Sequence, residues 1–182
     1  MSSLLTNLPQ TVALDFKLLL PGLKQCDAIA GRFNLERLRA EAVRAPAVLV
    51  SLLELTQKAG WSGPRHGFEA SMAAFVVTTD RMGALPRDQA AAAMAGLIAA
   101  HVPDRHWEID DCGEAQNVRA QPIVNAGMEK SKASLWAVTW VQPLVLQPLP
   151  ETQPADLTLY LGTAPEIGAD HQDDYEQIGD TP

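Results

Sequence analysis

Apolar side chains recur at helical spacing in two stretches of the chain. In the first, over residues 7–20, Asn7 can cap the helix and Pro21-Gly22 ends it. In the second, Pro86 sits in the first turn and Asp88 lies near the positive end of the helix dipole. We expect each helix to bury one face, formed by Leu8, Val12, Phe16, Leu19 and Leu20 in the first and by Ala90, Met94, Leu97, Ile98 and His101 in the second.

A third helix is predicted between these two, over about residues 35–44. Asn34 is its expected N-cap, and Phe33 is placed to pack on Leu38 as in a hydrophobic staple. Arg44-Ala45-Pro46 stops this helix.

Several segments have the pattern of strands. Residues 47–53 are apolar on both faces, as in a central strand, and residues 68–79 are rich in β-branched and aromatic side chains. The Gly/Pro-rich loop 56–67 joins them into a predicted pair. Further strands are expected over residues 26–30, 115–121 and 133–142, the last two as a hairpin with a long polar loop.

The strand over 133–142 has two apolar faces, so we expect both to be covered; Trp136, Val138 and Trp140 form one, and Leu135, Ala137, Thr139 and Val141 form the other. The order α-β-α-β-β-α-β-β predicts an α+β fold, a mostly antiparallel sheet with helices packed on one face, over residues 1–149. Pro143, Pro148 and Pro150 end this body. Residues 150–182 form an extended C-terminal arm, where strand character is confined to residues 157–161, with Leu157, Leu159, Tyr160 and Leu161.

Charge divides the chain at the same place. Residues 1–149 carry 14 basic and 14 acidic side chains, whereas the arm carries 8 acidic side chains and no basic one. The net charge of -8 therefore belongs to the arm. A surface that reads nucleic acid would need clustered Lys and Arg on the body, so the charge pattern argues against that class of protein.

Two cysteines, Cys26 and Cys112, are too few and too far apart to indicate a disulfide framework. We expect both to be buried free thiols. The chain starts without a basic leader region, and its first apolar stretch is interrupted by Asp15 and Lys17. We therefore expect neither a signal peptide nor a membrane span, and a protein that is cytoplasmic when made.

The histidines are the first place to seek catalysis or a metal. His101, Asp104 and His106 are close in sequence, but a helix end and a proline separate them, so they lack the His-x3-His spacing of a helical metal site. A helix-end histidine that interacts with the dipole is the favoured interpretation of His101. The acidic run 170–174 lacks the spacing of a calcium loop, and no nucleophile elbow, phosphate loop or zincin helix is present. The prediction is a protein that is not an enzyme, with no cofactor and no metal.

Two loops are candidates for contacts with other proteins. Trp61 lies on a Gly/Pro loop with little local core to join, and Trp and Arg are enriched at binding hot spots. We expect Trp136 and Trp140 in the core, while Trp107 fits either core or interface. The candidate interface residues are Trp61, Pro64, Arg65 and His66 in one loop and Asn125, Met128, Glu129, Lys130 and Lys132 in the other.

Five stretches together resemble the tail-terminator family of Mu-like phages. They are Gly31-Arg32-Phe33, residues 44–50 (RAPAVLV), residues 73–78 (AAFVVT), residues 135–140 (LWAVTW), and residues 164–168 (APEIG) followed by Asp174-Tyr175. None is a catalytic motif, so the resemblance lies in the overall arrangement.

The resemblance implies a structural virion protein that forms a ring on the head-proximal end of the tail, a hexamer in related tails. Such a ring caps the tail tube, stops its polymerisation and offers a docking surface to the neck or head. Its expected partners are further copies of itself, the tail tube protein and a neck or head-completion protein, with DNA only as cargo passing through the lumen and no membrane. It also implies a fold similar to other tail terminators, with helices against a sheet.

Two alternatives stay open. A head-closure or neck adaptor protein of the virion would differ in the partner it binds. A small cytoplasmic enzyme or ligand-binding α+β domain would require a deep pocket with convergent polar groups, for which His101, Asp104 and His106 are the candidates.

Overall fold

The computed structural model describes residues 4–31, 43–58, 65–79, 85–123, 133–146, 159–161 and 176–178. The chain divides into two compact units, Met1–Gln147 and Pro148–Pro182, which we describe separately. No helix in the described ranges is long and apolar enough to cross a membrane.

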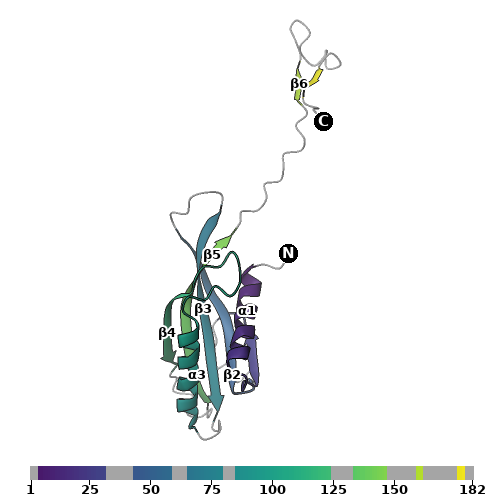
Figure 1. Ribbon diagram of the computed structural model, residues 1–182. Coiled ribbons are helices and arrows are strands. Elements are labelled where there is room, and N and C mark those ends of the chain that lie inside the picture. Colours follow the sequence, from purple (N-terminus) through teal and green to yellow (C-terminus); the bar gives the residue numbers. More distant parts are fainter. Residues whose placement is uncertain are drawn as a thin grey trace. The chain divides into compact units, whose positions relative to one another are not determined.

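The first unit contains an open five-stranded sheet (Figure 1). Its strands are β1 (Gln25–Ala28), β2 (Ala47–Gln57), β3 (His66–Thr79), β4 (Gln116–Pro122) and β5 (Ala133–Leu146), in the spatial order β1-β2-β3-β5-β4. β1 is parallel to β2, and every other pair is antiparallel. The mostly antiparallel sheet and the two predicted strand pairs are therefore confirmed.

The central strands are longer than the sequence pattern indicated. β2 continues to Gln57 and β3 begins at His66, so the connecting loop is shorter than the predicted 56–67. The exposed ends pair by backbone hydrogen bonds, which do not require apolar side chains.

β5 passes through Pro143, which was expected to end the body. The Gly113 N–H donates to the Pro143 carbonyl (2.8 Å), so this residue's backbone groups point toward Gly113. On the side of β5 that faces Gly113, Pro143 has only to accept a hydrogen bond. The absence of an N–H on proline therefore leaves no backbone group without a partner. An added Cβ on Gly113 would lie 3.0 Å from the Pro143 Cβ, so this close approach also favours glycine.

Both described helices, α1 (Leu4–Leu19) and α3 (Arg87–His101), pack on the same face of the sheet (Figure 1). α1 buries Leu8, Val12 and Phe16, as predicted, and α3 buries Ala90, Ala91, Met94, Ala95 and Ile98. The expected burial of Leu97 is wrong, because this side chain lies at the edge of the helix's buried arc and is 53% exposed. Three of the five buried residues of α3 are alanines, and Met94 and Ile98 are its large buried side chains.

A second apolar cluster occupies the opposite face of the sheet. It consists of Ala47, Leu49, Ala73, Phe75, Val77, Leu135 and Ala137, all buried. β5 thus buries residues on both faces as expected, with Trp140 in the core and Trp136 half-buried against it. Residues 32–42, where most of the third predicted helix falls, lie outside the described ranges, and Val43 and Arg44 are not helical.

The described residues of the second unit form two short strands. β6 (Leu159–Leu161) falls within the segment expected to form a strand, although Leu157 lies outside the described residues. β6 pairs antiparallel with β7 (Glu176–Ile178), and the two form their own sheet. The expectation that only residues 157–161 have strand character is therefore wrong. The sequence pattern does not indicate β7, because this short segment carries one aliphatic residue among polar and acidic neighbours.

Candidate functional site

A hollow of about 570 Å³ opens between α1 and the loop that follows α3. Its lining combines aliphatic, charged and aromatic side chains: Thr11, Leu14, Asp15, Leu18, Asp104, Arg105, His106, Trp107 and Glu108. The structure thus places Asp104 and His106, two of the residues weighed for metal or catalysis, at one site.

Gln142, fully buried on β5, fixes the loop beneath this hollow. Its Oε1 accepts hydrogen bonds from the Trp107 indole (2.8 Å) and the Trp140 indole (3.0 Å). Its Nε2 donates to the carbonyls of Arg105 (3.1 Å) and Gly113. One side-chain amide therefore uses all four of its hydrogen-bonding positions.

The loop backbone adopts a rare conformation at three non-glycine residues. The φ angles of Asp104, Trp107 and Glu108 are 62°, 58° and 56°, in the left-handed region that a bulky side chain seldom occupies. Trp107 compensates by packing edge-on against Phe16, with ring centroids 5.8 Å apart, and by its bond to Gln142. The loop has a fixed shape because buried side chains hold it. Sequence propensities do not indicate this loop conformation, because Trp107 and Glu108 are residue types that rarely adopt a positive φ.

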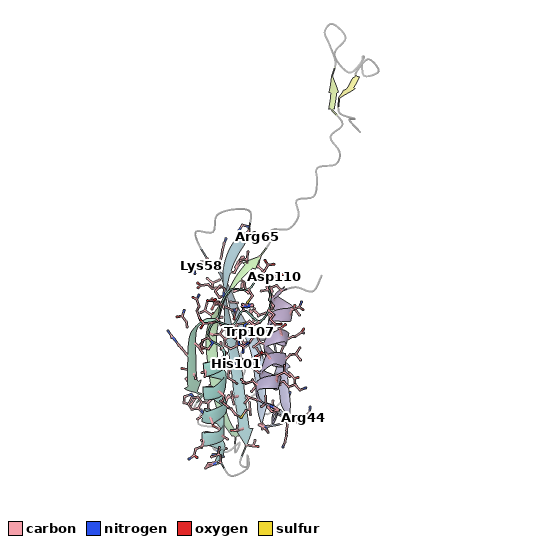
Figure 2. The ribbon with its side chains drawn as sticks, in the orientation of Figure 1. Arg44, Lys58, Arg65, His101, Trp107 and Asp110 are labelled. Atoms are coloured by element: carbon pink, nitrogen blue, oxygen red, sulfur yellow. The ribbon has the colours of Figure 1, made fainter. Side chains whose placement is uncertain are left out.

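His101 is not part of the lining of the hollow. Its Nε2 is 2.6 Å from Asp15 Oδ2, and its Nδ1 is 3.3 Å from Arg105 Nη2 (Figure 2 labels His101 and Trp107). A guanidinium only donates, so Nδ1 accepts and Nε2–H donates to Asp15. The predicted partner of His101 was the helix dipole; the structure adds a carboxylate 86 residues away, which no local pattern could reveal.

The three candidate ligands do not form a metal site. His101 is bound to Asp15, while Asp104 and His106 line the hollow. Among the described residues, no group of three His, Cys, Asp or Glu side chains could hold a metal ion. Nor does any hydroxyl or thiol in these ranges hydrogen-bond to His101 as a nucleophile would to its base.

The two candidate interface loops are described only in part. Arg65 and His66 are exposed at the start of β3, where Lys58 and Glu69 form an ion pair (2.9 Å) across the β2–β3 hairpin. The other candidates lie outside the described residues: Trp61, Pro64, Asn125, Met128, Glu129, Lys130 and Lys132.

Exposed apolar residues, not found from the sequence, lie on the outward side of each of the two helices. On α1, Leu14 and Leu18 are 65% and 84% exposed, opposite the buried face. On α3, Leu97 is exposed with three small residues beside it. We call this the outer helix surface and define it by Leu14, Leu18, Ala93, Gly96, Leu97 and Ala100. From Gln89 to Ala100, α3 carries no charged side chain on any face.

Comparison of the chain with models of protein families and with curated proteins finds no match. The resemblance to tail terminators therefore stays a prediction.

Both cysteines are free, Cys112 buried and Cys26 half-buried, which corrects the expectation that both are fully buried. Burial raises the pKa of each thiol to about 11, helped at Cys26 by the Asp27 carboxylate. With that pKa only about 0.1% of each thiol is ionised at pH 8. We expect reaction with a disulfide reagent at pH 8 to be roughly 100-fold slower in the native protein than in urea.

The same shift has a consequence for stability. Each thiol has a higher pKa in the folded than in the unfolded chain, so its contribution is complete below about pH 8.5 and is lost as pH rises toward 11. Urea unfolding at pH 8, 9.5 and 11 should show this fall. The variant Cys112→Ala should show a smaller fall in the free energy of unfolding, because it lacks one of the two thiols. Native thiols that react with the disulfide reagent as fast as unfolded ones would contradict the raised pKa values.

Proposed function

We propose that this protein is a structural subunit that assembles with copies of itself into a ring. The outer helix surface carries the proposal. A surface helix in a monomer normally presents charged side chains to water, and one that is apolar all round normally lies in an interior. α3 is uncharged from Gln89 to Ala100 and yet has an open side, which is what a subunit shows before its neighbour covers it.

The exposed leucines of α1 support the same conclusion. Leu14 and Leu18 lie one helical turn apart at the rim of the hollow formed by the 104–108 loop. Burying a leucine contributes roughly 1.5–3 kcal/mol, so the two together could supply a substantial part of a subunit contact. Aliphatic anchors beside a rigid, charged rim are typical of an interface core with a polar border.

The finer proposal is a tail terminator of a Mu-like phage, and the sequence resemblance supports it. In this role the ring caps the tail tube, stops its polymerisation and offers its other side to the neck or head. The arm's eight carboxylates would repel DNA at the lumen, or dock on a basic partner surface. The enzyme alternative gains no specific observation, since His101 does not join Asp104 and His106.

The double variant Leu14→Glu/Leu18→Glu tests the ring. Two carboxylates on the outer helix surface should weaken self-association at least 100-fold while leaving the fold intact, because both side chains are exposed in the single chain. Sedimentation velocity and negative-stain microscopy would measure the assembly, and capping of purified tail tubes would measure the activity.

The matched control is Thr6→Glu/Thr79→Glu, which adds the same charge at exposed positions off the outward stripe of α1. This control should assemble like the wild type. A wild-type protein that stays monomeric at high concentration and leaves tubes uncapped would refute the ring. Preferential capture of portal-side protein over tube protein would favour the neck-adaptor alternative.

A further inference from the structure

The five-stranded sheet has two edges, and they differ in length and charge. Within the described residues, β4 ends the sheet on one side with all its side chains exposed except the half-buried Val118. β1 ends it on the other side, is four residues long, and has its first residue engaged by a hydrogen bond from the Arg44 N–H to Gln25 Oε1 (3.0 Å). An exposed strand edge is a template for another strand, and proteins normally protect it.

The regular part of the β4 edge is short. The pairing of β4 with β5 is interrupted between Gln116 and Arg119, where Asn117 has a φ of 56°. Pro122, at the other end, has no N–H to offer. The segment Arg119–Gln121 keeps regular pairing with β5, so it can present a regular edge to three residues of an added strand.

β6 matches this edge in length. It is three residues long, and within the described residues β7 pairs with one of its sides while no strand pairs with the other. Its sequence, Leu-Tyr-Leu, suits a strand that packs on a partly apolar edge.

Charge selects β4 over β1. Residues 116–122 contain one arginine, Arg119, and no acidic side chain, whereas β1 contains Asp27. The arm has eight carboxylates and no basic residue, and Asp156 stands three positions before β6. Acidic flanks are therefore attracted to β4 and repelled by β1.

We infer that β6 of one copy adds as a strand to the Arg119–Gln121 edge of β4 in a neighbouring copy. This inference rests on the proposed ring, which would bring the two together. Residues 147–158 can span up to about 40 Å, enough to reach a neighbour. β4 ends its sheet within the described residues, and the ring would hold a neighbouring copy within reach of this edge, so the neighbour's β6 is the occupant we commit to.

Disulfide trapping tests the pairing on the full chain. Protein carrying Ala120→Cys is mixed with protein carrying Tyr160→Cys under mild oxidation, since adjacent strands bring Cα atoms within the range a disulfide spans. We expect a covalent dimer between the two chains, formed at least tenfold faster than with the matched pair Asp27→Cys and Tyr160→Cys, which probes the β1 edge.

A charge reversal gives a second readout. Arg119→Glu should weaken ring association by about tenfold at low salt and less at high salt, whereas Lys24→Glu, an exposed reversal beside β1, should have little effect. Sedimentation at two salt concentrations measures both.

The outcomes separate this inference from the proposed function. Rings that form and cap tubes, but give no disulfide between position 120 of one copy and position 160 of another, refute the strand addition and leave the proposed ring unaffected. A monomeric chain that carries both cysteines and closes the disulfide within itself refutes the choice of a neighbour. Wild-type protein that never assembles refutes both proposals.

Discussion

Replacing Gln142 with leucine should lower the free energy of unfolding by about 4 kcal/mol, because the buried partners of one amide lose their hydrogen bonds together. Two indole N–H groups would be left without an acceptor in the core, and the part-buried carbonyls of Arg105 and Gly113 would lose a donor. Leucine fills a similar volume, so most of the loss comes from unpaired polar groups. For a chain of this size the melting temperature should fall by roughly 8–16 °C.

Thermal and urea unfolding followed by circular dichroism would measure this loss. The control Gln10→Leu makes the same chemical change at an exposed position of α1 and should stay within about 0.5 kcal/mol of wild type. Within the described residues no buried side-chain nitrogen or oxygen lacks a partner, so Gln142→Leu would introduce a defect that the native core does not contain. A loss below 1 kcal/mol would show that water or loop movement replaces the amide.

Replacing Trp140 with alanine should cost about 3–5 kcal/mol, as for other large aromatic side chains deleted from a core. Its ring lies 6.3 Å from Phe16 and 6.2 Å from Trp107, measured between centroids, and so joins α1, the 104–108 loop and β5. Truncation removes this contact and the indole bond to Gln142 together. Unfolding in urea would measure the effect.

Trp136→Ala is the matched comparison, because Trp136 lies on the same strand and face but is only half-buried. Its loss should be less than half that of Trp140→Ala. Trp140→Phe should recover most of the packing but not the hydrogen bond, leaving a cost of about 1–2 kcal/mol. Equal effects of Trp136→Ala and Trp140→Ala would contradict the central place of Trp140.

Local pattern predicted those features that neighbouring residues control. Helical spacing located α1 and α3, and apolar runs located β2, β3 and β5, because a helix or strand that buries one face must repeat its apolar residues at the period of its backbone. The positions of charged residues along the sequence separated the neutral body from the acidic arm, because a count of charges does not depend on the tertiary structure. The predicted α+β class, with a mostly antiparallel sheet and helices on one face, followed from the order of these elements.

The candidate surfaces depended on tertiary structure. Whether Leu97 faces the sheet is decided by the docking angle of α3, and whether Pro143 ends a strand is decided by what Gly113 donates to it. Gln142 is the last residue of the strand expected over 133–142, but partners 29 to 37 residues away in sequence make it a buried residue at the centre of a hydrogen-bond network. The sequence alone determined periodicity, composition and the acidic arm. Only the folded chain decided which apolar residues stay outside and which sheet edge is open, because burial depends on residues far apart in sequence that meet in space.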